Sequence, residues 1–463
     1  MNVSVSAVDP SASTNSAETV AARLARIVTE QSFCRQPDSV VHAAKRCVID
    51  WFSAALPGAA TKPARALERG LLDELGHGNA RTLSGRRAPM RTAALINGLA
   101  SHVVEFDDIF APAIYHPGSP TIAAALAAAM GLNKTGRDLI NAVIAGYEAS
   151  TRVGAAMGPA HYRYWHNTGT IGSVGATAAV AFLFELTPSE TAEALATSTT
   201  MAAGLQNAFR GNSEIKPLHA GHAADSGFVA TALAQNGVVA ASDMFEGDTG
   251  FGAAMSKDVD WNAALVNPDQ FNILRTTVKN HGCCGHTFAA LDGALALQDE
   301  HGFAAMDIAS IRVGGYSATV DVTGNQIADT PGSAKFCLPF IVASGLVHGS
   351  IRLDAYSGAR LNDPVVRDMM PRITVELDPE VDRLFPTQRA ANIWITLNNG
   401  TELHRFQPHR VGDPDLPLSD DQLSDKFMEL TTGCLQPKSA RDLLNALWQL
   451  ERQTDLEFIL SRL

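Results

Sequence analysis

The sequence lacks the signatures of several broad classes of protein. Its six cysteines include no C-x-x-C pair, so neither a zinc ribbon nor a disulfide framework is predicted. It has no apolar run of about 18 residues or more, and we therefore expect no membrane-spanning helix. The N-terminus has no cationic and then apolar leader, so we expect a cytoplasmic protein with reduced thiols.

Basic residues are outnumbered by acidic ones. Lys and Arg total 36 against 48 Asp and Glu, which gives a formal net charge of -12. Nucleic acid is not a predicted partner, because binding a phosphate backbone requires a basic surface. An anionic small substrate is still compatible with this balance, since a few cations can dominate one pocket.

The hydrophobic pattern predicts a mainly α protein. Residues 1–17 are small and polar and are predicted to form a disordered tail. Over residues 18–270, apolar residues recur at helical spacing in stretches such as "AETVAARLARIVTEQ" and "SPTIAAALAAAMGL". We predict a large all-helical domain over this range. Several of its helices are apolar on nearly all sides and should lie inside a bundle or at a subunit contact.

After residue 270 the pattern changes to that of a smaller α+β domain, predicted over 271–405. Three stretches alternate β-branched and polar residues as strands do: "ASIRVGGYSATVDVTG", "PRITVELDPEV" and "ANIWITLNNGTELHRFQ". The "NNG" in the last one predicts a hairpin. Residues 406–463 are again helical and are predicted to return to the first domain. A cleft between a helical domain and a lid domain is a common place for a ligand site.

The stretch "SHVVEFDDIFAPAIYHPGSPTIAAA" places acids and a histidine at the mouth of a small-residue helix. Its three carboxylates are Glu105, Asp107 and Asp108. Ser119 or Thr121 is predicted to cap the helix, which would put His116 near its positive end, where an anion is favoured. The alternative is that the acids are solvated loop residues and His116 is a turn residue.

A second stretch, "HYRYWHNTGTIGSVGATAA", has His161 and His166 among aromatic residues, ahead of a turn rich in Thr, Gly and Ser. Histidines and aromatic residues before a helix N-terminus suit a carboxylate or carbonyl oxygen. The alternative is an aromatic patch at a dimer contact.

Two further stretches contain the lysines of interest. In "NSEIKPLHAGHAADSG", Lys216 is followed by His219 and His222, but H-x-x-H alone is a weak metal signal. In "LRTTVKNHGCCGHTFAALDGA", a glycine-rich loop gathers Lys279, His281, Cys283, Cys284 and His286. One of these cysteines could be a nucleophile, although no base is evident; the alternative is an inert buried pair with a capping histidine.

Nucleotide and serine-hydrolase motifs are missing, since no G-x-G-x-x-G follows a strand and no G-x-S-x-G elbow occurs. Lysines and histidines in a chain that has no phosphate-binding loop favour a substrate that carries carboxylates. Lys216 and Lys279 could hold the carboxylates by charge-assisted hydrogen bonds while a histidine moves a proton.

Six segments of the chain, in order and with matching spacing, resemble the MmgE/PrpD family: "EFDDIF…YHPGSPTIAAALA", "WHNTGTIGSVGATAA", "IKPLHAGHAADSG", "FEGDTGFGAAMS", "VKNHGCCGHTFAALDGA" and "AKFCLPFIVASGLVHG". The family includes 2-methylcitrate dehydratases, cis-aconitate decarboxylases and iminodisuccinate epimerases. The resemblance implies a small polycarboxylate substrate, no metal or organic cofactor, a large helical domain with an α+β lid, and a homodimer.

The resemblance also implies which residues form the site. We predict catalytic roles for five residues: His116, His166, Lys216, Lys279 and Glu105. We predict substrate-binding roles for seven more: Asp107, Asp108, Tyr115, Thr168, His219, Cys284 and His286. Cys284 and His286 are alternatives for the lid-side group, and either His116 or His166 could be the base or the acid.

Three departures from the family pattern stand out. Glu105 takes the place of an aspartate that many members have, and a longer acid shifts a proton-transfer or hydrogen-bonding distance. Ile109 replaces a hydroxyl residue of the decarboxylases, in a segment that is one residue longer before His116. Cys284 falls where the decarboxylases have a histidine, unless His286 takes that place. The last two departures weigh against decarboxylation of cis-aconitate.

We therefore predict a cofactor-independent lyase that abstracts a proton beside a carboxylate. Dehydration or hydration of a hydroxy-polycarboxylate similar to 2-methylcitrate is the first choice. Epimerisation, isomerisation or decarboxylation of a related acid is the second. A metal-dependent hydrolase built on His219, His222 and Cys283 ranks third, and a non-catalytic carboxylate-binding protein is the alternative from another class.

Overall fold

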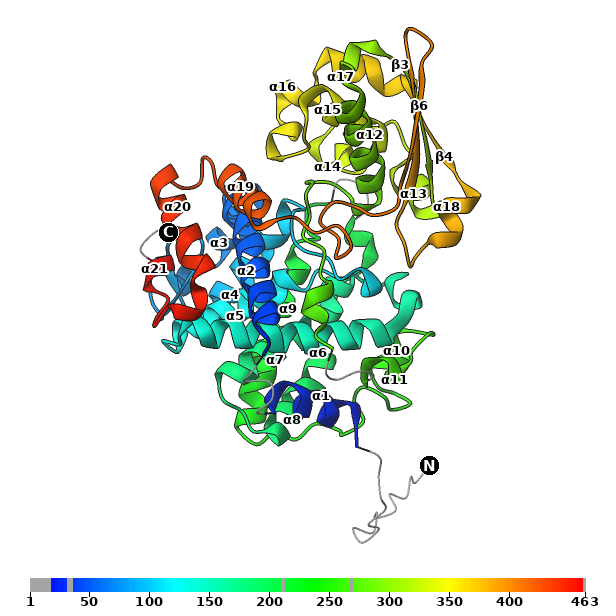
Figure 1. Cartoon of the computed structure of the whole chain (residues 1–463). Coiled ribbons are helices and arrows are strands. Elements are labelled where there is room, and N and C mark those ends of the chain that lie inside the picture. The colour runs from blue at the N-terminus through cyan, green and yellow to red at the C-terminus, as the bar shows by residue number, and fades with distance from the viewer. Residues whose placement is uncertain (1–17, 31–35, 210–212, 266–269, 461–463) are drawn as a thin grey trace.

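The chain folds into a helical body with a smaller domain standing on it (Figure 1). The computed structural model describes residues 18–30, 36–209, 213–265 and 270–460, so the tail predicted at 1–17 lies outside the described residues. The mainly α fold with a small α+β part confirms the fold class predicted from the sequence.

The helical body contains most of the helices. Those up to the middle of the chain are α1 (Val20–Thr29), α2 (Asp38–Ala59), α3 (Lys62–Gly70), α4 (Met90–Val103), α5 (Gly118–Gly131), α6 (Gly136–Tyr162), α7 (Asn167–Leu183), α8 (Pro188–Thr199), α9 (Leu218–Gln235), α10 (Phe251–Met255) and α11 (Trp261–Leu265). A short hairpin of β1 (Ala80–Arg81) and β2 (Arg87–Ala88) precedes α4 and was not predicted.

Small side chains allow close packing at the centre of the body. Helix α7 is almost entirely buried and packs against α5, α6 and α9, and α5 is equally buried. Helices α4 and α9 are in close contact at Gly98, where a Cβ atom would lie 2.9 Å from the Cα of Gly221. These helices are therefore apolar on all sides because neighbours surround them, as the sequence predicted.

The smaller domain contains the α+β elements. Its helices are α12 (Phe288–His301), α13 (Ser317–Thr323), α14 (Pro331–Ala334), α15 (Leu338–His348), α16 (Gly358–Leu361), α17 (Pro364–Met369) and α18 (Pro379–Leu384). Its strands are β3 (Ile308–Gly315), β4 (Ile373–Leu377), β5 (Ala391–Leu397) and β6 (Glu402–Gln407).

These four strands form one sheet in the order β4-β3-β5-β6. Strand β3 pairs in parallel with β4 and antiparallel with β5, so that Ile311 lies opposite both Ile373 and Ile395. These isoleucines are buried in the core that α12 and α15 complete. Strands β5 and β6 form the predicted hairpin, whose turn has Gly400 at a φ of 86°.

Two of the predicted strands are wrong in their second halves. The stretch predicted to continue past Gly315 turns into helix α13, in which Thr323 donates to the carbonyl of Thr319 at 2.7 Å. The stretch at 371–381 leaves the sheet after β4, because Asp378 accepts from the first backbone N–H groups of α18. Threonine and valine alternation therefore did not distinguish a strand from a short capped helix.

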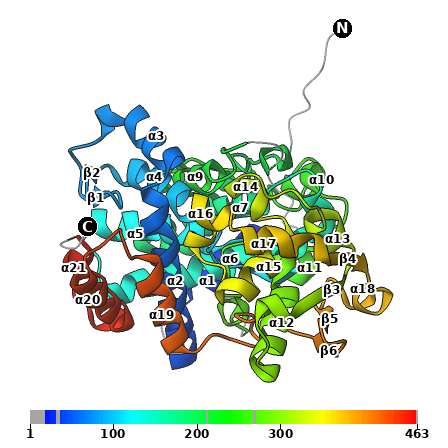
Figure 2. The ribbon, with the colours of Figure 1, turned by 90° about the horizontal axis from the view of Figure 1, so that it is seen from above.

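The C-terminal helices lie on the helical body. They are α19 (Asp420–Leu430), α20 (Pro437–Trp448) and α21 (Glu457–Leu460), and Figure 2 shows α19 and α20 beside α2. One hydrophobic core combines residues from 20–278 with residues from 418–459, and a second core contains residues 283–395. The chain thus leaves the body to build the smaller domain and then returns.

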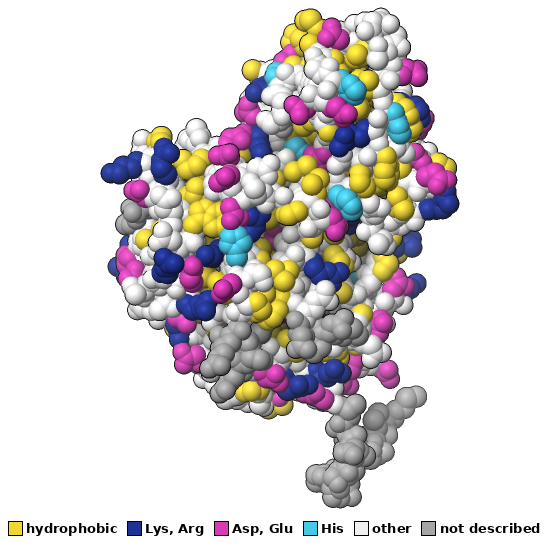
Figure 3. All heavy atoms as spheres, in the orientation of Figure 1, with side chains coloured by type: hydrophobic (Ala, Val, Ile, Leu, Met, Phe, Trp, Pro, Cys, Tyr) yellow, Lys and Arg dark blue, Asp and Glu magenta, His cyan; other side chains and the backbone are white. Residues whose placement is uncertain are grey.

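The surface is hollowed where the smaller domain rises from the body, and on the face shown Lys and Arg are interspersed with Asp and Glu (Figure 3). Among the described residues, no helix combines the length and the apolar character that crossing a bilayer requires.

Candidate active site at the junction of the two domains

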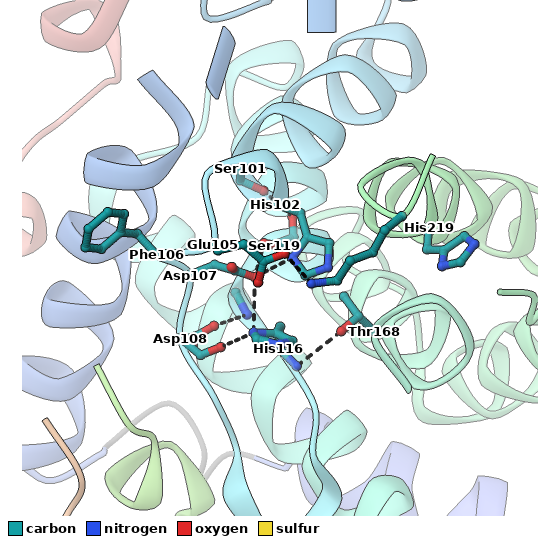
Figure 4. Close-up of polar contacts among 12 residues, drawn as sticks. Ser101, His102, Glu105, Phe106, Asp107, Asp108, His116, Ser119, Thr168 and His219 are labelled. Carbon is teal, nitrogen blue, oxygen red and sulfur yellow. Dashed lines mark hydrogen bonds and ion pairs between the residues drawn. The ribbon is translucent and has the colours of Figure 1, made fainter. Parts of the chain in front are cut away.

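A buried aspartate connects two helices of the body and two imidazoles (Figure 4). Oδ2 of Asp107 lies 2.6 Å from Nδ1 of His102 and 3.3 Å from Nδ1 of His116, and the hydroxyl of Ser119 donates to it at 2.9 Å. His102 is in the last turn of α4 and Ser119 is in the first turn of α5. Burial alone would raise the pKa of Asp107, but the two histidines hold it well below its ordinary value.

Asp108 differs from Asp107 in its environment and in its charge at neutral pH. Its Oδ1 accepts from the backbone N–H of Gly118 at 2.9 Å, and the hydroxyl of Tyr147 donates to its Oδ2 at 2.5 Å. Burial raises the pKa of Asp108 to about 8. Both carboxyl oxygens accept hydrogen bonds, so the side chain supports the start of α5, and the substrate-binding role predicted for it stays a prediction.

The predicted cap of α5 is wrong. The hydroxyl of Ser119 points to Asp107, and that of Thr121 has no hydrogen-bond partner within the described ranges. Asp108 satisfies the first N–H of the helix instead, from ten residues earlier in the chain. A Cβ atom at Gly118 would lie 2.9 Å from the Asp108 carboxylate, so this contact requires glycine.

His116 is held as a neutral base. Its Nδ1 lies 2.7 Å from the carbonyl oxygen of Asp108, which can only accept, so Nδ1 is the protonated nitrogen. Nε2 is then unprotonated and able to take a proton. Burial, opposed only in part by Asp107, lowers the pKa of His116 to about 3, so the ring is neutral near pH 7. Its backbone N–H donates to Thr168 at 3.4 Å.

Two lysines meet at Glu105. Lys216, from the loop before α9, forms an ion pair with Oε1 of Glu105. Nζ of Lys279, from the segment that leads into the smaller domain, donates to the Glu105 carbonyl at 3.0 Å and lies 3.7 Å from Oε2. It is also 4.0 Å from Asp107. Lysines that are 111 and 174 residues away along the chain thus converge on one acid.

These charges stabilise one another in spite of burial. Burial favours the neutral form of Glu105, but Lys216 and Lys279 outweigh it and lower its pKa. Burial likewise disfavours charged Lys216, and Glu105 and Asp107 raise its pKa above the ordinary value. Glu105 and Lys216 are therefore charged at neutral pH, and the ammonium group of Lys216 is held in a fixed position.

The C-terminal helix α19 holds the segment that leads into the smaller domain. Lys426 of α19 is fully buried, forms an ion pair with Asp50 of α2, and donates to the carbonyl of Lys279 at 2.6 Å. It also donates to the carbonyl of Phe106 at 3.4 Å. Helix α19 thus fixes the backbone at Phe106, beside Glu105 and Asp107, and at Lys279.

A pair of imidazoles extends the site toward solvent. Nδ1 of His166 lies 2.9 Å from Nδ1 of His219, and the ring of His166 stacks on His102 with centroids 5.2 Å apart. Burial and the neighbouring cations hold the pKa of His166 well below its ordinary value. A mostly apolar hollow of about 600 Å³ lies beside His219, and Leu205 and Leu218 line it.

On the side of the smaller domain, the predicted thiols are not activated. Burial raises the pKa of both Cys283 and Cys284, so both are protonated at neutral pH and neither is a favoured nucleophile. Nδ1 of His286 lies 2.7 Å from the hydroxyl of Tyr316, and burial lowers the pKa of His286 to about 3. The part of the chain that the structure describes shows no hydrogen bond or ion pair from Cys284 or His286 to Glu105.

The structure brings most of the predicted residues into one network: Glu105, Asp107, Asp108, His116, Thr168, Lys216 and Lys279. His166 stacks on His102, and His219 lies beside His166. Tyr115 is different. It is fully buried in an apolar cluster with Phe110, Ala113 and Ile171 and lies outside this network, and the substrate-binding role predicted for it stays a prediction.

Sequence reasoning missed two residues that the structure places here. His102 is fully buried and orients Asp107, and its position five residues before that acid in "SHVVEFDD" is the signal that could have found it. Lys335 is half-buried with its Nζ 5.4 Å from the ring centre of Tyr356, and has no acidic side chain within 4 Å among the described residues. Burial lowers its pKa, although the charge of Glu105 opposes this.

Three residues could together hold a metal ion within the described ranges: His102, Asp107 and His116. The 2.6 Å separation of His102 from Asp107 is that of a direct hydrogen bond. The histidines that were considered for a metal at the sequence level do not meet in this way. His219 contacts His166, and Nε2 of His222 lies 3.1 Å from the carbonyl of Met201.

The fold and the site define a class of protein: a helical body with an α+β domain, and a buried group of lysines, acids and imidazoles where the two meet. The chain belongs to the MmgE/PrpD family. The MmgE/PrpD N-terminal domain matches residues 22–264, and the MmgE/PrpD C-terminal domain matches residues 281–452.

The chain is similar over nearly its whole length to three further proteins. A cis-aconitate decarboxylase-like protein of Aspergillus oryzae is 26% identical, with 96% of each chain covered. The cis-aconitate decarboxylase of Mus musculus is 26% identical, over 92% of this chain and 89% of that protein. The cis-aconitate decarboxylase of Aspergillus terreus is 23% identical, with 92% of each chain covered.

Proposed function

We propose that this protein is a lyase that acts on a small polycarboxylate, and that decarboxylation of an acid of the cis-aconitate type is its first candidate reaction. The observation that supports the site chemistry is the neutral His116, whose free Nε2 belongs to the same network as the lysines clamped by Glu105. The relatives named above favour decarboxylation, and they lend no support to the dehydration of 2-methylcitrate in particular.

The lysines would stabilise the charge that develops in the reaction. When a carboxylate leaves as CO2, or when a proton is removed beside a carboxylate, an electron pair is left that delocalises into a remaining carboxyl group. The ammonium groups of Lys216 and Lys279 are fixed in a buried place where such oxygens would bind. One preorganised donor of this kind lowers a barrier by about 2.7 to 4 kcal/mol.

His116 would transfer the proton. Decarboxylation ends with the delivery of one proton to carbon, and dehydration begins with the removal of one from carbon. Nε2 of His116 suits either role, because the carbonyl of Asp108 fixes the tautomer and Asp107 would stabilise the imidazolium once it forms. His166, linked to His219, is the second group placed to donate or accept a proton.

Dehydration or hydration of a hydroxy-polycarboxylate is the second candidate. The depressed pKa of His116, about 3, favours a group that begins the cycle as a base, as proton abstraction from carbon requires. Cys284 stands where the decarboxylases have a histidine, which also agrees with this chemistry. Epimerisation or isomerisation would use the same abstraction followed by reprotonation from the other side.

Proton NMR of the purified, metal-free protein in D2O tests the proposal. The panel would be cis-aconitate, trans-aconitate, citrate, 2-methylcitrate and iminodisuccinate. Loss of CO2 with deuterium at a new carbon position identifies a decarboxylase, and loss or gain of water with every carboxylate retained identifies a hydro-lyase. If neither turnover nor deuterium exchange occurs with any of these acids, while they still raise the melting temperature, a non-catalytic carboxylate-binding protein is favoured and the lyase proposal fails.

A further inference from the structure

One buried arginine in the smaller domain has no acidic partner. The described part of the chain has three buried arginines: Arg152, Arg389 and Arg410. Arg152 forms an ion pair with Glu148, and Arg410 forms one with Asp413. Arg389 is 7% exposed, and no carboxylate lies within 4 Å of it among the described residues.

Arg389 reaches from the smaller domain to the loop before the proposed base. It lies just before β5, and one terminal N–H group donates to the carbonyl of Ala111 at 3.2 Å. Ala111 begins a short turn that ends at Ala113, and His116 follows three residues later. Nε of Arg389 is buried and has no hydrogen-bond partner. Its hydrogen-bonding capacity is therefore only partly used.

The neighbouring polar groups do not neutralise this charge. The charge of Asp413 acts on Arg389, but both carboxylate oxygens of Asp413 accept hydrogen bonds from Arg410, at 2.6 and 2.7 Å. The positive charge of Arg389 instead acts on His286 and lowers its pKa further. The charges of Arg389 and Lys216 both act on Tyr162, so the arginine lies within electrostatic reach of the site.

A buried guanidinium without a counter-ion is unfavourable, because it loses its hydration and stays protonated at all ordinary pH values. Its planar N–H groups match the two oxygens of a carboxylate. An anionic ligand that enters between the two domains would supply both the missing charge and the missing acceptor.

We propose that Arg389 binds a second carboxylate of the substrate, remote from the one held by Lys216 and Lys279. This inference rests on the proposed function, since it extends the same site to the far end of the same polycarboxylate. The site then has a lysine end and an arginine end, and it selects acids with two or more carboxylates over acids with one. Because Arg389 belongs to the smaller domain and touches the loop before His116, binding there also holds the two domains together around the substrate.

Ligand-observed NMR binding measurements test this with two probes, tricarballylate, which has three carboxylates, and butyrate, which has one. We expect Arg389→Gln to weaken tricarballylate binding at least tenfold and to change butyrate binding less than twofold. Arg383→Gln is the matched control, because Arg383 is an exposed arginine of the same domain that pairs with Glu380. The control should leave both affinities unchanged. Equal effects of Arg389→Gln on the two probes, no effect on either, or no binding of tricarballylate to the wild-type protein would overturn the inference.

Melting temperatures without ligand separate binding from a structural role. If Arg389 serves binding, Arg389→Gln should melt at the same temperature as the wild type or higher, because an unpaired buried charge has been removed. A lower melting temperature with unchanged tricarballylate affinity would mean that the arginine only connects the domains.

Arg389→Lys provides a second variant, which retains the charge and loses the planar arrangement of donors. It should weaken tricarballylate binding by a smaller factor than Arg389→Gln does, and an unchanged affinity would contradict the inference. These readouts need no turnover. If the D2O experiment shows no reaction while Arg389→Gln still loses tricarballylate, the lyase proposal fails and the second carboxylate subsite stands.

Discussion

Glu105 adopts a φ of 64°, a left-handed conformation that is unfavourable for a residue with a side chain. Ile114, a β-branched residue two positions before His116, does the same with a φ of 48°. Strained backbone of this kind persists where surrounding contacts impose it and is frequent at functional sites. At Glu105 these contacts are the ion pair of its side chain with Lys216 and the hydrogen bond that Lys279 donates to its carbonyl oxygen.

Removal of either lysine should abolish most of the activity. We expect Lys216→Ala and Lys279→Ala each to lower kcat by about 10² to 10³, because each removes one fixed cation from the developing negative charge. Lys62→Ala is the matched control, since Lys62 is an exposed lysine that pairs with Glu214. Steady-state kinetics on the acid identified by NMR measures the effect. A decrease of less than threefold in both variants would remove the lysines from the mechanism.

The pH dependence of stability should reveal Asp108. Its folded-state pKa is about 8, well above its ordinary value of 3.8, so the folded protein binds a proton that the unfolded chain has lost. The contribution of Asp108 to stability therefore falls as the pH rises toward 8, by up to about 1.4 kcal/mol per pH unit. The depressed pKa values of His116, His166 and His286 act in the opposite direction, up to about pH 7.5, where the unfolded chain has lost its histidine protons.

Asp108→Asn should reduce this loss of stability. The amide is neutral at every pH and retains an oxygen for the N–H of Gly118. Urea unfolding at pH 6.5, 7, 7.5 and 8 should show that the wild type loses stability relative to the variant as the pH rises, because the histidine contributions are the same in both proteins and cancel in the difference. Parallel curves for the two proteins would mean that Asp108 is ionised throughout this range.

Among the elements, the packing of α4 against α9 sets the distance between His102 and His219. A Cβ at Gly98 would lie 2.9 Å from the backbone of Gly221, and backbone atoms at such a contact must move apart. We expect Gly98→Ala to lower the free energy of unfolding by about 1 to 3 kcal/mol and to reduce activity as well. Urea unfolding and initial rates measure both effects.

Gly70 supplies the control for this substitution. It is the last residue of α3, and a Cβ there would have no atom within 4 Å. Gly70→Ala should leave stability unchanged or raise it by up to about 1 kcal/mol, because alanine loses less backbone freedom on folding. If both alanine variants have the stability of the wild type, α4 and α9 are not in the close contact described.

For the molecule as a whole, the C-terminal segment is part of the site. Lys426→Met would leave Asp50 buried without its partner and remove the donor to the Lys279 carbonyl. We expect a loss of stability of about 3 to 5 kcal/mol, together with a lower kcat. The double variant with Asp50→Asn removes both charges and should recover much of the stability but not the activity. Equal destabilisation in the single and double variants would contradict the role of this pair.

The assembly of two copies stays a prediction from the sequence. Light scattering of the purified protein should give a mass of twice the 49.0 kDa of one chain. A mass of one chain at micromolar concentration would contradict the predicted homodimer.

Local patterns in the sequence were sufficient for much of the fold. Helical spacing predicted α2, α5 and α7, and the "NNG" turn predicted the β5–β6 hairpin, because these elements depend on contacts between residues a few positions apart. The same reasoning placed the ionisable residues in four loops and helix starts. It failed at α13 and α18, where capping contacts overrode a pattern typical of strands.

The amino-acid sequence by itself determined the helical character, the hairpin and the kinds of charged groups that the protein contains, since these follow from local spacing and composition. Only the tertiary structure decided that His102 orients Asp107, that Asp108 caps α5, and that Tyr115 is a core residue. It also decided that lysines more than 100 residues from Glu105 meet there. These contacts join distant segments, and burial then sets which groups are charged, so spacing along the chain contains no direct record of either.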